Sequence, residues 1–273
     1  IKLRADLDSA LADFKRSQSE DNFIWLGRRY AYLGDYNTAI DTFSRGLTKY
    51  PASYKLLRHR GHRYITTRQL DLAIADLSRA AALAASHPDE VEPDGAPNKL
   101  NQPRSTTQSN IYYHLGLAHY LKGDFAAALP AYQQCLAYAR VNDDMLVATT
   151  YWLYLTLRRL NREPQAAAAI EPIRPKMDII ENSAYHRLLL MYRGELRTEE
   201  LIPRTPSTGI SAMAPIDDAT TSYGLGAWHW CNGDHAAAVM LWQQTLATNN
   251  WTAFGYIAAE AELARSLGEQ RHE

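Results

Sequence analysis

Apolar residues recur along this chain at the spacing of a helix surface. Phe23, Leu26, Gly27 and Tyr30 share one face of a helix, because each residue turns the chain by about 100°. No long stretch alternates apolar and polar residues around β-branched side chains, and alanine runs such as 126–128 favour helices. The pattern therefore predicts an all-α protein.

The helical pattern also repeats. Leu-Gly-Arg-Arg-Tyr at 26–30 returns as Arg-Gly-His-Arg-Tyr at 60–64, a period of 34 residues. Gly-Asp-Phe-Ala-Ala-Ala at 123–128 is echoed by Gly-Asp-His-Ala-Ala-Ala at 233–238. A fixed period of this length is typical of a solenoid built from stacked helical hairpins.

The first unit resembles the tetratricopeptide repeat (TPR) family. That family's consensus has a large residue, Leu-Gly, Tyr, Ala, an aromatic residue, Ala and Pro at set offsets. Those offsets are filled here by Phe23, Leu26-Gly27, Tyr30, Ala39, Phe43, Gly46 and Pro51. The resemblance covers about three-quarters of the chain. It implies a right-handed superhelical solenoid of about six TPR-like helical hairpins, with flanking helices at both ends.

The repeats and their interruptions divide the chain into seven parts. We predict a flanking helix at 1–19, TPR-like units 1–2 at 20–87, units 3–5 at 109–202, unit 6 at 219–252 and a capping helix at 253–273. Proline-rich inserted loops at 88–108 and 203–218 complete the division. Both loops follow the second helix of a unit, so both leave the same edge of the solenoid. They are either passive connections or segments that fold toward the binding face.

In the TPR family, the side of each first helix opposite its packing positions lines a concave groove where partners dock. Here that side is rich in aromatic rings and arginines, which interfaces use as anchors and as contacts for acidic groups. The predicted partner-binding residues are Trp25, Arg28, Tyr32, Arg58, His62, Tyr113, Tyr120, Trp152, Arg158, Tyr192 and Trp230. Alternatively, rings on the inner face of a tight superhelix pack against one another and only fill its wall.

The best-known binding mode of the family is a two-carboxylate clamp for the acidic tail of chaperones. The clamp needs Lys, Asn and Arg at set positions of three units. Those positions hold Ile24, Arg28, His59, Asn110 and His114 here. The pattern is absent, so this ligand is not carried over.

Composition narrows the classes of partner. The net charge is −1 and the pI about 6.8, which gives no electrostatic case for nucleic acid or an anionic membrane. No apolar run approaches the ~20 residues that span a bilayer. Cys135 and Cys231 are too far apart to form a disulfide framework. The chain begins with Ile1 and not Met, which indicates processing or trimming. The compartment therefore stays open, either cytoplasmic or reached by export after removal of a signal peptide.

The residues offer little catalytic chemistry. His59 and His62 are three apart on one helix face, but arginines flank them and no carboxylate or cysteine completes a metal site. Asp143-Asp144 and Asp217-Asp218 each precede a helix, where capping explains them. No nucleophile elbow or phosphate-binding loop occurs. We predict no catalytic residues, no metal and no cofactor.

The sequence thus predicts a non-catalytic protein–protein interaction scaffold. It would bind a peptide segment of a partner, with acidic groups, on an aromatic, Arg-bearing concave face. One alternative is a receptor for a small molecule or glycan, and another is a structural element that assembles into homo-oligomers. A receptor requires a pocket closed by an inserted loop, whereas a peptide scaffold requires an open groove.

Overall fold

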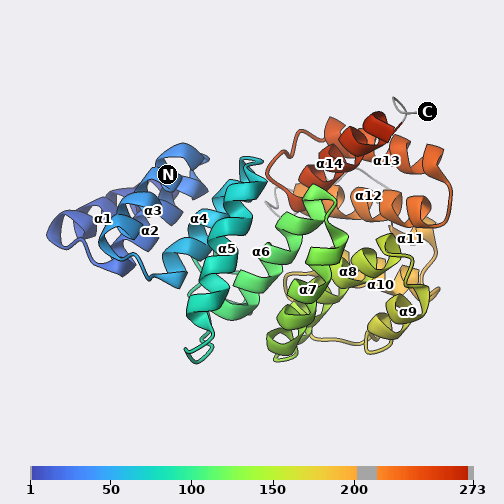
Figure 1. Ribbon diagram of the computed structural model, residues 1–273, viewed down its shortest axis with the longest axis horizontal. Coiled ribbons are helices and arrows are strands. Elements are labelled where there is room, and N and C mark those ends of the chain that lie inside the picture. The colour runs from blue at the N-terminus through green and yellow to red at the C-terminus, as the bar shows by residue number, and fades with distance from the viewer. Residues whose placement is uncertain (1, 202–213, 270–273) are drawn as a thin grey trace.

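The computed structural model describes residues 2–201 and 214–269, with the side chains of 214–216 and 267–269 left aside. Over these ranges the chain forms fourteen helices and no strand, which confirms the predicted all-α solenoid (Figure 1). The helices are α1 (Lys2–Arg16), α2 (Glu20–Tyr32), α3 (Tyr36–Lys49), α4 (Tyr54–Thr66), α5 (Leu70–Ala84), α6 (Thr107–Lys122), α7 (Phe125–Ala139), α8 (Asp143–Arg159), α9 (Glu163–Ile170), α10 (Ser183–Tyr192), α11 (Thr198–Leu201), α12 (Ala214–Cys231), α13 (His235–Ala247) and α14 (Phe254–Glu269).

A Gly-Asp pair makes the turn inside three of the hairpins. Gly34 has φ 82° and so ends α2 in the left-handed conformation that glycine adopts without strain. The carboxylate of Asp35 then accepts the backbone N–H of Thr38 and caps α3. Gly123-Asp124 and Gly233-Asp234 repeat this arrangement before α7 and α13. The recurrent dipeptide therefore sets where one helix stops and the next begins.

A second glycine position fixes how closely the two helices of a hairpin approach. At Gly116 in α6, an added Cβ would lie 2.8 Å from the ring of Tyr132 in α7, which is too close for real contacts. Gly27 faces Phe43 in the same way, Gly61 faces Leu77 and Gly226 faces Trp242. These four first helices, α2, α4, α6 and α12, thus have a notch that receives a large side chain of the second helix.

The fifth hairpin departs from this plan. After α10, the second helix is reduced to α11, which has only four residues. Most of the second proline-rich loop, residues 203–213, lies outside the described residues, and so do 270–273 of the predicted capping helix.

The C-terminal helix closes the superhelix onto its first half. α14 packs on α12 and α13 and also contacts α6 (Figure 1). The guanidinium of Arg68, which follows α4, donates to Glu260 at 2.8 Å and to the carbonyl of Trp251 at 2.7 Å. Trp251 in turn meets the ring of Tyr36 edge to face at 5.5 Å. The array is therefore curved enough for its last helix to touch hairpins at the start.

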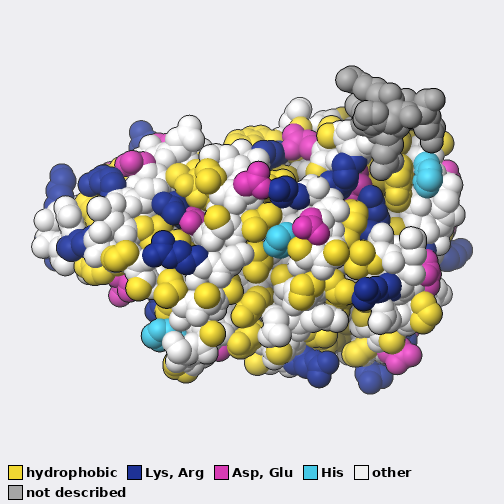
Figure 2. All heavy atoms as spheres, in the orientation of Figure 1, with side chains coloured by type: hydrophobic (Ala, Val, Ile, Leu, Met, Phe, Trp, Pro, Cys, Tyr) yellow, Lys and Arg dark blue, Asp and Glu magenta, His cyan; other side chains and the backbone are white. Residues whose placement is uncertain are grey.

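The surface carries charges of both signs. Figure 2 shows basic and acidic side chains interspersed over one face, in keeping with the net charge of −1. None of the helices in residues 2–201 and 214–269 has the length and apolar content needed to cross a bilayer.

Candidate functional site

The connection between α5 and α6, here called the inserted segment (residues 85–106), folds across the concave face. In the middle of the segment, Arg29 of α2 donates to the carbonyl of Gly95 at 3.1 Å. Three residues later, Asn98 donates to Glu181 at 2.6 Å, just before α10. These two contacts connect the segment to the first hairpin and to the start of the fifth. Of the two predicted behaviours for this loop, the structure shows folding toward the inner face.

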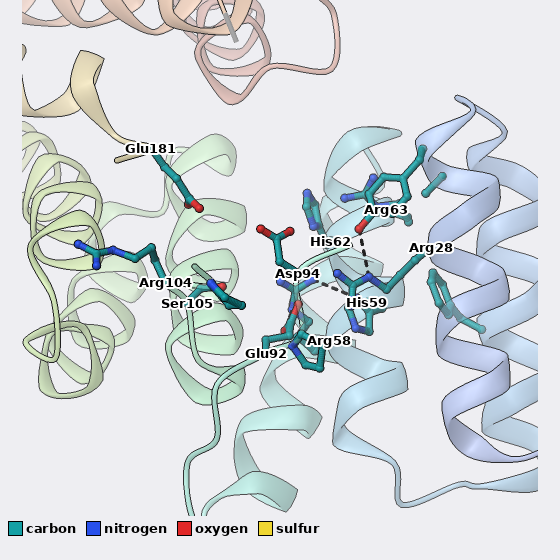
Figure 3. Close-up of a pocket in the computed structure, with 15 residues that line it drawn as sticks. Arg28, Arg58, His59, His62, Arg63, Glu92, Asp94, Arg104, Ser105 and Glu181 are labelled. Carbon is teal, nitrogen blue, oxygen red and sulfur yellow. Dashed lines mark hydrogen bonds and ion pairs between the residues drawn. The ribbon is translucent and has the colours of Figure 1, made fainter. Parts of the chain in front are cut away.

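A cavity of about 190 Å³ lies beneath the inserted segment. Figure 3 shows α2 and α4 forming one wall and the inserted segment facing them. The first wall contributes Arg28, Tyr32, Arg58, His59, His62 and Arg63, and the segment contributes Glu92, Pro93 and Asp94. Two further hollows share lining residues with it, one of about 250 Å³ beside Trp25 and Lys55 and one of about 310 Å³ beside Tyr113 and Phe254.

One of the arginines on this wall has an internal counterion. The Nε atom of Arg58 lies 2.9 Å from Oε2 of Glu92, and both side chains are about nine-tenths buried. The N–H of that nitrogen does not point at an acceptor, so the contact is a charge pair more than an aligned hydrogen bond. Glu92 also accepts from the amide of Asn110 at 3.2 Å. The inserted segment therefore supplies one carboxylate to the basic wall.

Two other arginines on the wall form no ion pair with any carboxylate of the described residues. Arg28 is 9 % exposed, its Nε–H donates to the hydroxyl of Tyr32 at 3.2 Å and its guanidinium lies 4.5 Å from the Trp25 ring. Arg63 is half-buried and lies 5.6 Å from the ring of Tyr36. Both guanidinium groups line the cavity, where the carboxylates of Asp94 and Glu181 also lie but do not pair with them.

The crowding of positive charge shows in the ionisation of the wall. Burial, and then the nearby charge of Arg58, lowers the pKa of Arg63 to about 10. Burial, followed by a neighbouring arginine, lowers the pKa of His59, His62 and His114 well below the usual histidine value. At neutral pH these histidines are uncharged, so the charge of the wall comes from its arginines.

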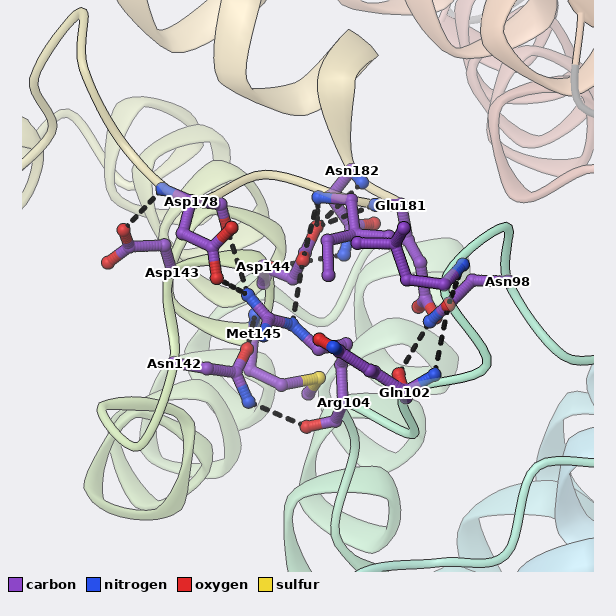
Figure 4. Close-up of polar contacts among 12 residues, drawn as sticks. Asn98, Gln102, Arg104, Asn142, Asp143, Asp144, Met145, Asp178, Glu181 and Asn182 are labelled. Atoms are coloured by element: carbon purple, nitrogen blue, oxygen red, sulfur yellow. Dashed lines mark hydrogen bonds and ion pairs between the residues drawn. The ribbon is translucent and has the colours of Figure 1, made fainter.

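Asp144 anchors the other end of the inserted segment (Figure 4). Its carboxylate is fully buried and accepts the Nε–H of Arg104 at 3.0 Å. It also accepts three consecutive backbone N–H groups, from residues 180–182, each within 2.9 Å. Arg104 further pairs with Asp178 at 2.7 Å. This carboxylate therefore ties the inserted segment to the connection between α9 and α10.

The role of Asp144 differs from the predicted one. The helix-capping residue of α8 is Asn142, whose side chain accepts the backbone N–H of Met145. The amide of Asn142 also donates to the carbonyl of Arg104 at 2.7 Å. The Asp143-Asp144 pair thus follows the cap, and its second member is free to bind Arg104.

Residues 109–142 match the family model described as tetratricopeptide repeat. This hairpin is a tetratricopeptide repeat, and the helices around it form an all-α TPR solenoid. The matched residues include all of α7 and nearly all of α6, the hairpin where Gly116 receives Tyr132. Among curated proteins, none matches the sequence.

Solved structures share the fold of this TPR protein. A tetratricopeptide repeat protein from Parabacteroides merdae is 11 % identical, with a TM-score of 0.51 over 94 % of this chain and 92 % of that one. YrrB, a TPR protein with an unusual peptide-binding site, is 10 % identical with a TM-score of 0.49, over 94 % and 98 % of the two chains. MamA is 16 % identical with a TM-score of 0.44, over 82 % and 94 %. At such low identities the likeness concerns the fold alone.

The TPR array brings six of the predicted partner-binding residues to the three hollows. Arg28, Tyr32, Arg58 and His62 line the central cavity, and Trp25 lines the hollow beside it. Tyr113, which is 7 % exposed, lines the hollow on the other side.

Two predicted anchors are buried in the core. Trp152 is fully buried and donates its indole N–H to the hydroxyl of Tyr113 at 2.8 Å. Tyr120 is 1 % exposed and shares a 2.9 Å hydrogen bond with Tyr223. The superhelix is so tight here that first helices pack their inner faces together, and these rings cannot meet a partner on an open surface. The expectation that they do is corrected.

Three more predicted residues bond to neighbouring helices in the C-terminal half. Arg158 donates to the carbonyl of Cys231 at 2.7 Å and to the hydroxyl of Tyr154 at 2.9 Å. Tyr192 donates to the carbonyl of Gly224 at 2.9 Å. Trp230 stacks on the ring of His235 at 4.2 Å. Arg158 and Tyr192 thus join hairpins to one another, and Trp230 joins the two helices of its own hairpin. All three side chains are half-buried, and none lines the central cavity.

Sequence reasoning missed Arg63, Glu92 and Asp94. Arg63 is the tenth residue of its unit, a position outside those assigned to the concave side. Its equivalent one period earlier is Arg29, and this repeated arginine was a usable signal. The acidic run 89–94 in the first proline-rich loop, close in sequence to a basic helix, was a signal for the two carboxylates.

Proposed function

We propose that this TPR protein is a non-catalytic interaction scaffold that binds an acidic segment of a partner protein in the central cavity. The TPR architecture itself supports a protein or peptide as the partner. An acidic segment and a location in the central cavity are proposed because of Arg28 and Arg63. These two arginines line the cavity without an ion-pair partner among the described residues.

The energetic reason is the cost of burying an uncompensated charge. A guanidinium removed from water loses hydration, and only charge pairing or hydrogen bonding offsets that loss. A carboxylate from a partner would supply both, since the guanidinium fork matches its two oxygens. Hydrogen bonds to charged groups contribute about 1.5–3 kcal/mol each, enough to make these arginines the main source of affinity.

The neighbouring rings supply apolar contact area. Trp25 and Tyr32 are half-buried and stand on α2 beside Arg28. Such rings bury much area for few rotatable bonds, which suits them to hold the aliphatic part of a bound segment. The proposed binding surface therefore comprises Trp25, Arg28, Tyr32, Arg58 and Arg63.

The inserted segment limits the length of the proposed contact. The segment crosses the concave face, since Gly95 contacts α2 and Asn98 contacts the residues before α10. A partner therefore cannot run along the whole inner surface while the segment stays in place. The proposed contact surface is therefore smaller than the one predicted from the sequence, which extended to the last hairpin. Contact is instead concentrated on α2 and α4.

A small acidic molecule is a second candidate for the cavity. The specific observation in its favour is that the inserted segment roofs a space of only about 190 Å³. Glutarate is a suitable probe because it carries two carboxylates without a peptide backbone. Binding of glutarate but not of acidic peptides would favour the receptor over the scaffold.

The scaffold is tested with fluorescein-labelled hexaglutamate and fluorescence anisotropy. Arg28→Gln and Arg63→Gln are each expected to weaken binding about tenfold, equivalent to about 1.4 kcal/mol. Arg140→Gln removes the same charge from an exposed site after α7 and serves as the matched control. Equal affinities for all three variants would show that binding follows net charge and would refute the proposed site.

A further inference from the structure

The start of the inserted segment is an acidic arm, residues 89–94, with the sequence Asp-Glu-Val-Glu-Pro-Asp. The arm faces the basic wall across the cavity, and much of its own surface is exposed to water. Val91, an apolar side chain in its middle, is 56 % exposed. Of its four carboxylates, Glu90 and Glu92 form ion pairs with the wall. The arm is thus bound to the wall mainly through charge.

The two ion pairs share one geometry. Oε1 of Glu90 lies 2.6 Å from the ammonium of Lys55, and Oε2 of Glu92 lies 2.9 Å from Nε of Arg58. Lys55 and Arg58 are three residues apart on α4 and so share a face of that helix. Glu90 and Glu92 are two apart, and in an extended backbone such residues point to the same side. The arm matches the spacing of cations on α4.

The backbone of the arm is extended where these pairs form. Val91 bridges to Thr106 in antiparallel fashion. The N–H of Glu92 donates to the carbonyl of Ser105 at 2.9 Å, and that of Thr107 donates to the carbonyl of Glu90 at 2.9 Å. Two hydrogen bonds of this kind are a short ladder, which water can replace when the arm moves away.

From this match we infer that the acidic arm is an internal occupant of the docking surface. A partner segment takes its place, using two carboxylates two residues apart in an extended backbone to meet Lys55 and Arg58. The inference rests on the proposed function and adds to it the spacing of acidic groups and a competitor within the same chain. The displaced arm keeps its attachment through residues 98–106.

The competition has a defined thermodynamic effect. If the surface is open in only a fraction of molecules, the apparent dissociation constant rises by the inverse of that fraction. Weakening the arm's hold therefore strengthens partner binding with no new contact to the partner. Tighter binding after the loss of two carboxylates is specific to the arm. Removing two carboxylates elsewhere on the protein would leave the affinity of the docking surface unchanged.

The experiment compares wild type with the double variant Glu90→Gln, Glu92→Gln. The probe is a nine-residue peptide of the sequence 88–96 with Asn at both aspartates and with blocked ends. Its control exchanges the Val and the second Glu, so that the same two carboxylates stand next to each other. The variant is expected to bind the probe about tenfold tighter than wild type does, and the control peptide about fivefold more weakly than the probe.

A second variant separates displacement from a change in net charge. Glu163→Gln, Glu171→Gln removes the same two charges from exposed positions flanking α9. We expect its affinity to equal that of wild type within about twofold. Equal affinities for the arm variant and wild type, or for the two peptides, would overturn the inference.

Hydrogen exchange gives an independent readout on wild type. When the probe binds, the amides of Glu92 and Thr107 are expected to exchange faster, since their acceptors separate as the arm leaves. Unchanged or slower exchange at saturating probe would contradict displacement. If hexaglutamate binds in an Arg28-dependent manner while the arm variant behaves as wild type, only this inference fails. If neither protein binds any acidic peptide, the proposed function fails with it.

Discussion

The two ends of the inserted segment are held by opposite kinds of contact. The acidic arm is attached through Glu90 and Glu92, whose partners line solvent-connected hollows. Residues 98–106, here called the anchored segment, are attached through Arg104 to a fully buried carboxylate, Asp144. One loop therefore combines a part that can exchange its partners with a part that cannot.

An ion pair can stabilise a fold or merely occupy a surface, depending on its burial. If Arg104 is lost, the buried carboxylate of Asp144 keeps its three backbone N–H donors but has no counterion. The half-exposed carboxylate of Glu90 exchanges its partner for water at small cost, whereas the exchange costs more at Glu92, which is about nine-tenths buried. Charge pairs of similar length can thus differ severalfold in their effect on stability.

The sharpest test of this comparison is Asp144→Ala. We expect the free energy of unfolding to fall by about 3–5 kcal/mol, because three buried N–H groups lose their acceptor and Arg104 keeps only Asp178 as a counterion. Asp178→Ala removes the exposed partner of the same arginine and should cost less than about 1 kcal/mol. Urea denaturation measures the free energy of unfolding of both variants. Equal losses would show that the strength of these ion pairs in the anchored segment does not depend on their burial.

At the other end, Glu92→Gln is expected to cost less. The new Gln side chain keeps an oxygen that accepts a hydrogen bond from Asn110, but it has no charge opposite Arg58. The expected loss is about 1–3 kcal/mol, as for a buried charged group left without its counterion. Denaturation and probe binding should move in opposite directions, with lower stability and higher affinity. A variant that loses both would show that the arm supports the docking surface.

His62 and His114 make the stability of the protein depend on pH. Burial and nearby arginines lower the pKa of His62 and His114 in the folded protein, whereas the unfolded chain takes up protons near pH 6.5. The unfolded state binds more protons below that value, so stability is greatest above it and falls as the pH drops. Each histidine contributes a slope of up to about 1.4 kcal/mol per pH unit.

Replacing one of these histidines should make the slope shallower. For His114→Gln, we expect the slope of the free energy of unfolding against pH, measured from pH 7.5 to 5.0, to decrease by the contribution of about one proton. The amide of Gln keeps a hydrogen-bonding group near the carbonyl of Asn110, which the ring nitrogen contacts at 2.6 Å. An unchanged slope would mean that this histidine is protonated as readily when folded as when unfolded.

The smallest effect is expected at the outer pair. Lys55 and Glu90 are about one-third and one-half exposed, so Lys55→Met should cost less than about 1 kcal/mol. Raising the salt concentration should remove that difference, since exposed pairs are screened. A salt-independent loss would place Lys55 among the fixed contacts, beside Arg104.

The helical array was predictable because its cause is local and repeated. A glycine opposite a large side chain and a Gly-Asp turn recur with the period, and each is visible in the sequence at Gly27, Gly116 and Gly34-Asp35. The cavity was predictable only in part. Arg28 and Arg58 follow from the repeat register, which specifies the concave side of α2 and α4.

The rest depends on where segments go in space. The course of residues 85–106 across the groove has no repeat to follow, so the roles of Glu92 and Arg104 were not foreseen. The burial of Trp152 results from the tight curvature of the whole array, to which every hairpin contributes. A register assigns a side chain to a face, but it does not say whether that face stays open.

The closure by α14 has a consequence for how the chain folds. In an open repeat array each unit touches only its neighbours, so the ends can unravel one unit at a time. Here Arg68 and Glu260 meet although 192 residues separate them. Contacts of such sequence separation slow folding and couple the first hairpins to the last helix. Truncation before α14 should therefore lower the protection of α4 amides against exchange, a loss that strictly local stacking would not transmit.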